Sequence, residues 1–256
     1  MAEEPIVDYW LITYKKIGRL PHLLEQLRKS PVPYKITVLD NSTDEAFVNN
    51  EVRPLLQEGE DLLVSPQNLM CCAGSQHLLN VTKAPFIGYL CANHTEINDP
   101  TWVLDCLYGM QNDPQIAMCG CVKPTAGLYA YKAHWSHPNP QAFFPYTLPK
   151  LEANFTREQI FELANTQIHV QGGMWFGRRD ALRQIGGFET ALPHLFMDVE
   201  IAIRLQCYGF MLGHVPSIYS SHVASEAVPN HRDFKLCHYY YEKPEDMPQQ
   251  QGAPNV

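Results

Sequence analysis

The fold class is first apparent in the stretch Lys35-Ile-Thr-Val-Leu-Asp-Asn-Ser-Thr-Asp44. Its apolar, β-branched first half predicts a buried strand, and its polar second half predicts the loop at the carboxyl end of that strand. Short apolar segments alternate with helical apolar stripes over residues 5–122. Such alternation is typical of right-handed βαβ units, so we expect an α/β fold with a mainly parallel sheet flanked by helices.

Apolar periodicity predicts the individual elements. Strands are expected at residues 5–13, 35–39, 62–64, 85–91, 116–122 and 168–176, with edge strands at 210–220. Helices are expected at residues 20–27, 47–56, 74–81, 100–110, 156–164, 179–185 and 196–208. In the helix at 100–110, Asp99 is the expected N-cap and Pro100 the first helical residue.

Polar clusters follow three of the expected strands. They are Thr13-Tyr14, Asp40-Asn41 and Asn93-His94-Thr95-Glu96. Open parallel sheets bind their ligands beyond the carboxyl ends of the strands, which is where these clusters would converge. The sequence therefore predicts a ligand site at that edge of the sheet.

The segment from Phe196 to Gly209 predicts an amphipathic helix. The residues expected on its buried face are Ile201, Ala202, Leu205 and Tyr208. Asp198 falls in the first turn, where the helix dipole favours an ionised carboxylate. Glu200 and Arg204 are spaced for an intrahelical ion pair on the surface. Asp198 is therefore either a helix cap or a general base beside the glycine-rich stretch that starts at Gly172.

Composition narrows the function classes. The 256 residues carry a net charge of -8 with a pI near 5.7, which argues against a broad surface for nucleic acid or anionic membrane. We see no secretory leader and no apolar run approaching about 18 residues, so we expect a cytoplasmic protein without a membrane segment. The eight cysteines are expected to be reduced and mostly buried thiols.

Taken in order, four segments resemble glycosyltransferase family 2, the inverting nucleotide-sugar transferases with the Rossmann-like GT-A fold. They are Ile12-Thr-Tyr14, Val38-Leu-Asp-Asn-Ser-Thr-Asp44, Asn68-Leu-Met-Cys-Cys-Ala-Gly74 followed by Gln76, and Gly172 to Phe188 leading to Met197-Asp198. The resemblance covers residues 5–222. It implies a single GT-A domain over 1–226: a nucleotide-sugar half at 1–122, an aromatic-rich acceptor-side insertion at 123–167, and an acceptor and catalytic half at 168–226. A polar tail would follow at 227–256.

The resemblance also implies a role for individual residues. Asp198 would be the catalytic base, and Trp175 and Met197 would contact the acceptor, although Trp175 could equally pack in the core. The implied donor-binding residues are Thr13, Tyr14, Asp40, Asn41, Asn68, Gly74, Asn93, Gly173, Arg178 and Arg204. Asp40 would accept a hydrogen bond from a uracil-type N–H, or else only form the turn that follows it. Arg178, Arg179 and Arg204 would neutralise the leaving diphosphate, unless they are simply solvated.

The metal motif departs from the family pattern. The family carries Asp-x-Asp or Asn-Asp after its fourth strand, whereas this chain has Cys91-Ala-Asn-His-Thr-Glu96, with His94 in place of the metal-binding Asp. His94, Glu96 and His222 would hold Mn²⁺ or Mg²⁺ against the diphosphate. A metal-independent enzyme is the alternative. Met70 stands where the family usually has Gly.

The expected donor is a UDP-sugar, with thymidine as the second choice of base, and the transferred group is a hexose or a pentose. The acceptor would be a glycan, a lipid-linked sugar or a small molecule, or a hydroxylated base in phage-type DNA, which the acidic net charge disfavours. A non-catalytic sugar-binding protein is the alternative from another class, because the metal motif is degenerate. A zinc deaminase would need Pro-Cys-x-x-Cys and a dinucleotide-dependent oxidoreductase G-x-G-x-x-G, and neither occurs where it is required.

Overall fold

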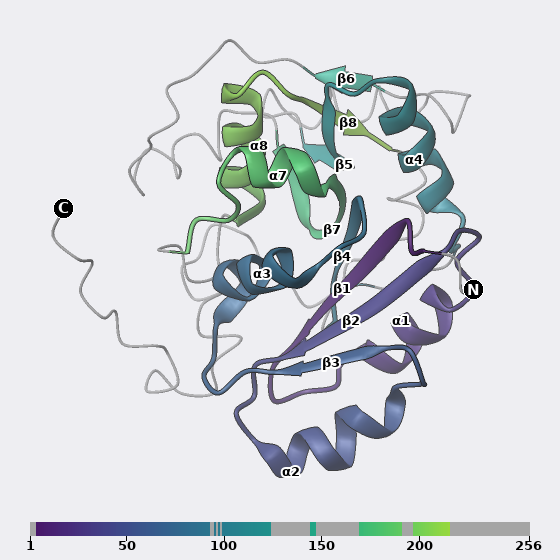
Figure 1. Ribbon diagram of the computed structural model, residues 1–256, viewed down its shortest axis with the longest axis vertical. Coiled ribbons are helices and arrows are strands. Elements are labelled where there is room, and N and C mark those ends of the chain that lie inside the picture. The colour runs from purple at the N-terminus through teal and green to yellow at the C-terminus, as the bar shows by residue number, and fades with distance from the viewer. Residues whose placement is uncertain are drawn as a thin grey trace, which may run out of the picture.

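The computed structural model describes residues 4–92, 95, 97, 99–123, 144–146, 169–190 and 197–215. In these ranges the chain forms a mixed eight-stranded sheet with the strand order β3-β2-β1-β4-β7-β5-β8-β6 (Figure 1). Most of the predicted insertion at 123–167, including the helix expected at 156–164, lies outside the described residues. The predicted tail at 227–256 lies outside them as well.

The strands are β1 (Val7–Thr13), β2 (Tyr34–Asp40), β3 (Asp61–Val64), β4 (Phe86–Cys91), β5 (Ile116–Lys123), β6 (Phe144–Tyr146), β7 (His169–Arg178) and β8 (Met211–His214). The helices are α1 (Leu20–Leu27), α2 (Glu45–Phe47), α3 (Met70–Val81), α4 (Trp102–Asn112), α7 (Arg179–Gln184) and α8 (Met197–Cys207). A π-helical turn (Val48–Val52) and a 3-10 turn (Arg53–Leu55) continue α2. The predicted elements within the described ranges are present, and α3 begins earlier than predicted.

The sheet is mainly parallel, as expected, but the direction of β7 and the position of β8 were not predicted. β1 is parallel to β2 and β4, and β2 is parallel to β3, as predicted. However, β7 is antiparallel to both β4 and β5, so the sheet is mixed. β8 lies between β5 and β6 and is not the edge strand that we predicted. A buried strand has the same apolar pattern in either direction and at any interior position, so the sequence pattern could not decide these two points.

Helices cover both faces of the sheet (Figure 1). α1 and α4 pack on one face, where Leu24 is among the fully buried residues. α3, α7 and α8 pack on the other face, where Ile201 is fully buried. Side chains alternate along β1 between the two apolar layers, with Tyr9 in the first and Trp10 in the second. The result is a three-layer α/β/α arrangement.

Two helices differ in detail from the predictions. In α8 the residues Ile201, Ala202 and Leu205 are buried as predicted, but Tyr208 is 48% exposed because the helix ends one residue before it. Gly209 follows with a φ of +88°, a left-handed conformation that glycine adopts without steric cost. Asp99 does not cap α4, since its carboxylate accepts the N–H of Thr101 at 2.8 Å and Thr101 is itself the N-cap.

The cysteines described with their side chains are thiols, as predicted. Cys72, Cys106 and Cys119 are buried, and Cys71, Cys91 and Cys207 are partly buried. Among the described residues no helix is both long and apolar enough to cross a membrane.

Candidate functional site

Two of the polar clusters lie together at the carboxyl ends of β1 and β2. The parallel register sets Thr13 beside Asp40, and Thr13 Oγ1 donates a hydrogen bond to Asp40 Oδ2 at 2.6 Å. The N–H of Asn41 donates to the carbonyl of Thr13 at 2.9 Å, so the two strands stay paired one residue past the end of β2. Tyr14 follows with its ring 5.3 Å from the ammonium of Lys15.

Asp40 organises the loop that follows it. The residue is fully buried, and its Oδ1 accepts the N–H of Ser42 at 2.9 Å together with the Ser42 hydroxyl. Both carboxylate oxygens are therefore engaged by the chain itself. These bonds form the turn after Asp40, which was one of the two roles expected of this residue. The exposed residues of this loop are Thr43 and Asp44, which Asp40 holds at the rim of the sheet.

Backbone strain is concentrated at the same end of the sheet. The non-glycine residues with positive φ in the described ranges are Lys15 (49°), Thr43 (59°) and Met70 (62°). They follow β1, follow β2 and begin α3 after β3, respectively. A left-handed conformation costs such residues about 1–2 kcal/mol, and strain of this kind is found preferentially at functional sites. At position 70 the observed φ is one that glycine favours, which accounts for the glycine in the family pattern.

The start of α3 is held against β2. The carbonyl of Met70 accepts Asn41 Nδ2 at 3.1 Å, and its N–H donates to Asn68 Oδ1 at 2.9 Å. A Cβ at Gly74 would lie 3.1 Å from Leu39 Cδ2, so the glycine permits close packing of α3 on the sheet. Asn68 and Gly74 thus shape the turn into α3, which places its first residues beside the Thr13–Asp40 pair.

Asp198 lies against the glycine pair of β7. The antiparallel register pairs Met174 with Leu90, so Gly173 lies level with Cys91, the last residue of β4, and Gly172 lies just beyond it. A Cβ at position 172 would lie only 2.9 Å from Asp198 Oδ2. The missing side chain therefore makes room for the carboxylate, which is half-buried in the first turn of α8.

The loop after β4 is fastened to the same glycine pair. The N–H of Thr95 donates to the carbonyl of Cys91 at 2.9 Å, and Thr95 Oγ1 donates to the carbonyl of Gly173 at 2.7 Å. Its predicted donor residue Asn93 and the predicted metal ligands His94 and Glu96 lie outside the described residues, as does His222 in the C-terminal region. Within the described residues no group of three or more His, Cys, Asp or Glu side chains could hold a metal ion.

The predicted role of Arg178 in diphosphate binding is corrected by its position. β7 is antiparallel to β4 and Arg178 pairs with Phe86, the first residue of β4, so Arg178 lies at the amino end of the sheet. Cys91, at the other end of β4, is five residues further along, which is roughly 17 Å at the rise of an extended strand. Arg178 Nε donates to the carbonyl of Ile116 at 2.9 Å. Arg179, its neighbour, donates to the carbonyl of Thr82 at 3.1 Å.

Arg204 also serves the fold. Its guanidinium donates to the carbonyls of Ile185 and Gly187 at 2.9 and 2.6 Å and is paired with Glu200. The predicted surface ion pair is in fact largely buried, with 14% and 8% of the two side chains exposed. Burial raises the pKa of Glu200, an effect that the hydrogen bond and charge of Arg204 oppose. These contacts hold the turn after α7 against α8.

The predicted acceptor contacts are both buried. Trp175 is fully buried, with its ring stacked on Tyr89 at a centroid distance of 5.2 Å and edge-on to Trp10 at 6.2 Å. It is therefore a core residue, which was the alternative to stacking on a sugar. Met197 is 4% exposed and faces α3, where Ser75 Oγ lies 3.4 Å from its sulfur. Neither side chain lines an open acceptor surface in this structure.

Sequence reasoning missed two residues of the site. Gly172 was recognised only as part of a glycine-rich stretch, and Thr95 only as part of a polar cluster. The adjacent pair Gly172-Gly173 within an expected strand was an available signal, because glycine inside a strand often marks a close approach of another group.

Solved structures that resemble this chain include glycosyltransferases. A mannosyltransferase from Pyrobaculum calidifontis in complex with GDP-Man and Mn²⁺ has a TM-score of 0.61 at 16% identity, with 93% of this chain and 61% of that chain covered. GalNAc-T7 with UDP, GalNAc and Mn²⁺ has a TM-score of 0.58 at 12% identity, with 83% and 43% covered. The chain has the GT-A fold.

The similarity to these structures covers only part of their length. TarS of S. aureus, truncated to its first 349 residues, has a TM-score of 0.50 at 15% identity, with 82% of this chain and 58% of that chain covered. The chain thus spans about three-fifths of the mannosyltransferase and less of GalNAc-T7. No protein-family model and no curated protein sequence matches it.

Proposed function

We propose that this chain is an inverting glycosyltransferase that moves a hexose or pentose from a nucleotide diphosphate donor to an acceptor hydroxyl. The observation that carries the proposal is the Asp198 carboxylate, which lies against the backbone of Gly172 at the carboxyl end of the sheet. The first turn of a helix favours an ionised carboxylate, and an ionised carboxylate is a competent general base.

The reaction then follows from this placement. Asp198 accepts the proton of the acceptor hydroxyl as the hydroxyl oxygen attacks the anomeric carbon of the donor. The new C–O bond forms on the face opposite the breaking bond to the diphosphate, so the configuration inverts. The diphosphate departs with the electron pair of the broken bond. Gly172 contributes by having no side chain, because a methyl group there would displace the base.

The donor is assigned to the carboxyl ends of β1 and β2, beside Thr13, Tyr14 and the loop that begins at Asn41. Because Asp40 is buried and internally hydrogen-bonded, its role is to hold this loop at the nucleotide. Uridine is the proposed base, on the strength of the resemblance to family 2. The mannosyltransferase and GalNAc-T7 were solved with GDP-Man and UDP, respectively, which supports a nucleotide-linked donor as the class.

We propose that His94, Glu96 and His222 would hold a divalent ion, Mn²⁺ or Mg²⁺, which would supply positive charge to stabilise the leaving diphosphate. Support comes from the Mn²⁺ in both of those solved structures and from Thr95, which fastens the loop between His94 and Glu96 to Gly173. The described residues do not form a metal site by themselves. The roles given to Asp198 and Gly172 accordingly rest on their own geometry and not on a metal.

The test is incubation of the protein with a panel of UDP-sugars and of glycan, lipid-linked and small-molecule acceptors in the presence of Mn²⁺. Release of UDP with a product of inverted anomeric configuration, read by ¹H NMR, is the expected result. A product of retained configuration would contradict the role of Asp198 as base. Binding of UDP without any product would instead support the non-catalytic sugar-binding alternative. Hydroxylated DNA belongs in the panel as the acceptor that the net charge disfavours.

A further inference from the structure

We propose that Cys71, Ser75 and Met197 form an anchor that positions Asp198, so that Met197 acts on the reaction through the base and not through the acceptor. The inference rests on the proposed function, because it assumes that Asp198 is the base. It assigns a positioning role to three buried or partly buried side chains that the mechanism above does not use.

The anchor is a set of contacts between the first two turns of α3 and the first residue of α8. Met197 is the first residue of α8, immediately before Asp198. Its Sδ is 3.4 Å from Ser75 Oγ and 3.5 Å from Cys71 Sγ, and both of these groups can donate a proton to it. A thioether is a weak acceptor and its side chain is flexible, so two donors converging on one sulfur add a directional restraint to its packing.

Cys71 is in turn tied to the core of the sheet. Its Sγ lies 3.1 Å from the hydroxyl of Tyr89 in β4, and the Tyr89 ring stacks on Trp175 in β7. Burial, together with the charges of Cys91 and Asp198, raises the pKa of Cys71 to about 12, while the Tyr89 hydrogen bond opposes the rise. The thiol therefore keeps its proton at neutral pH. A consistent arrangement has Tyr89 O–H donating to Cys71 and Cys71 S–H donating to Met197.

The geometry around Asp198 makes its position sensitive. Its Oδ2 fits against Gly172 so closely that a Cβ there would be 2.9 Å away. A displacement of the first turn of α8 by a fraction of an ångström therefore moves the base relative to the bound donor. Misplacement by about 1 Å can cost an enzyme on the order of 100-fold in rate. The anchor also connects the two halves of the site, since α3 begins at Met70, whose carbonyl accepts Asn41 beside the donor loop.

The test compares Cys71→Ala and Met197→Leu with matched controls. Cys72→Ala is the control for Cys71→Ala, because it makes the same change at the next residue of α3, which is buried. Met110→Leu is the control for Met197→Leu, because it makes the same change at a buried methionine of α4 on the other face of the sheet. Cys71→Ser retains a donor and serves as the conservative rescue. Each variant is measured by amide hydrogen exchange along α8 and by steady-state kinetics of UDP release from the UDP-sugar that the wild type turns over best.

We expect exchange in the first two turns of α8 to rise about tenfold in Cys71→Ala and Met197→Leu but not in the controls. We expect kcat to fall about tenfold in the same two variants with the KM of donor and acceptor unchanged, and Cys71→Ser to restore most of it. Unchanged exchange would overturn the anchor. Faster exchange with an unchanged kcat, or a raised acceptor KM alone, would overturn the positioning role. If the wild type releases no UDP from any donor, the proposed function fails, and with it the positioning role, while exchange still decides whether the anchor exists.

Discussion

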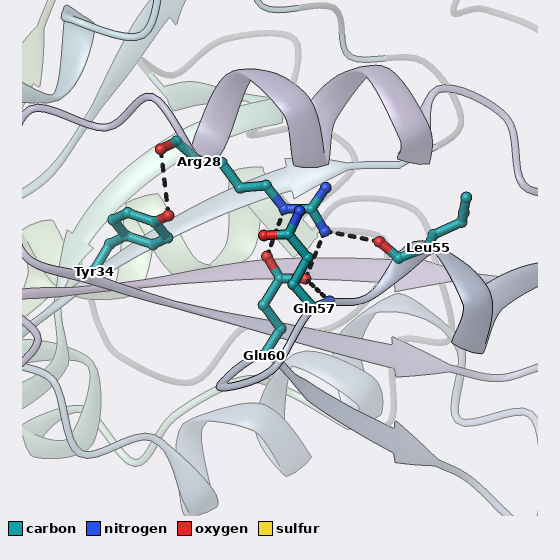
Figure 2. Close-up of polar contacts among 5 residues, drawn as sticks. All are labelled: Arg28, Tyr34, Leu55, Gln57 and Glu60. Carbon is teal, nitrogen blue, oxygen red and sulfur yellow. Dashed lines mark hydrogen bonds and ion pairs between the residues drawn. The ribbon is translucent and has the colours of Figure 1, made fainter.

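The amino end of the sheet, where β1, β2 and β4 begin, uses its charged residues to complete the fold. Arg28 makes a two-pronged ion pair with Glu60 at 2.8 and 2.7 Å and also donates to the carbonyl of Leu55 (Figure 2). Arg178 and Arg179 bind the carbonyls of residues that precede or begin neighbouring strands. In this region polar groups hydrogen-bond to one another, and the arginine side chains hold loops in place.

The carboxyl end also has polar groups that bond to one another, such as Thr13, Asp40 and Ser42, but it differs in its backbone strain and in one partly exposed carboxylate. Its non-glycine residues include Lys15, Thr43 and Met70 in left-handed conformations, and it holds the half-buried carboxylate of Asp198 beside a glycine. Strain and a partly exposed charge lower the stability of a fold and are retained where they serve binding or catalysis. We infer that the amino end of the sheet mainly stabilises the fold and that the carboxyl end carries the chemistry. The variants below test this division.

The largest expected effect separates two aspartates that each occupy the first turn of a helix. Asp198→Asn should lower the turnover of the UDP-sugar on the order of 1000-fold, because the base is lost, while donor affinity stays near normal. Asp180→Asn, in the first turn of α7 at the amino end, should leave turnover unchanged. Steady-state kinetics and nucleotide titration measure both. Equal turnover of the two variants would contradict the assignment of the base.

A second pair compares two glycines at opposite ends of β7. Gly172→Ala should reduce turnover about 100-fold by pushing Asp198 aside. In Gly177→Ala the new Cβ would lie 3.2 Å from Trp175 in the core, so this variant should lose stability while the surviving folded protein remains active. Kinetics normalised to folded protein distinguish the two. A Gly172→Ala variant with normal turnover would contradict the claim that the absence of a side chain at Gly172 positions Asp198.

Substitutions at the amino end should change stability and leave turnover unchanged. Arg28→Met leaves the largely buried Glu60 carboxylate without its partner and should lower the free energy of unfolding by about 2 kcal/mol. Turnover per folded molecule should not change. Urea denaturation followed by circular dichroism gives the first quantity. The exposed pair Lys29–Glu25 provides the matched control, and Lys29→Met should cost far less. A loss of turnover in Arg28→Met beyond the loss of folded protein would break the division between the ends.

Two carboxyls at the amino end should affect the pH dependence of stability in opposite directions. Burial raises the pKa of Asp8 above 3.8, although hydrogen bonds from Thr82 and Thr37 oppose the shift. The folded state therefore holds the Asp8 proton more tightly, and this contribution to stability is lost as pH rises from 3.8 through the raised pKa. Burial also acts to raise the pKa of Glu60, but the Arg28 hydrogen bond, the Gln57 N–H and the Arg28 charge outweigh it, so the pKa is lowered below 4.5. Its contribution is present above 4.5 and is lost as pH falls through the lowered pKa.

Denaturation of Asp8→Asn and Glu60→Gln between pH 3 and pH 7 measures these contributions as differences from the wild type. The wild type should lose stability relative to Asp8→Asn as pH rises and lose stability relative to Glu60→Gln as pH falls. Differences of the same sign in the two variants would contradict the assigned shifts.

The smallest expected effect concerns strain. Thr43 is exposed and has a φ of 59°, which asparagine tolerates better than a β-branched residue. Thr43→Asn should therefore raise the free energy of unfolding by about 0.5–1 kcal/mol. Thr190→Asn, at an exposed residue without a positive φ, should have no such effect. Denaturation midpoints decide the comparison, and equal shifts at the two positions would show that strain at residue 43 is not being relieved.

Much of the fold could be predicted because burial imposes a period on the sequence. The stripe of Leu20, Leu23, Leu24 and Leu27 located α1, and all four side chains are buried. The direction of β7 carried no such signal, and the misplacement of Arg178 follows from it, since reversing a strand exchanges the ends of the sheet that its terminal residues occupy. Trp175 illustrates the same limit, because an aromatic residue in a strand can face the core or a ligand.

The site was predictable to the extent that strand ends converge. Thr13 and Asp40 were expected side by side and share a hydrogen bond. What sequence could not supply is clearance: the room that Gly172 leaves for Asp198 depends on two elements far apart in the chain. The engagement of both Asp40 oxygens by Thr13 and Ser42 was likewise outside the reach of a pattern, because it depends on the conformation of one loop.

We propose above all that the carboxyl end of the sheet binds a nucleoside diphosphate. The most direct measurement is the melting temperature of the protein with UDP, GDP, CDP or dTDP, each in Mn²⁺ and in EDTA. A ligand that binds only the folded state raises the melting temperature by mass action. We predict a rise with UDP that is larger in Mn²⁺ than in EDTA and is preserved in the Arg28→Met variant. No rise with any of the four nucleotides would contradict the claim.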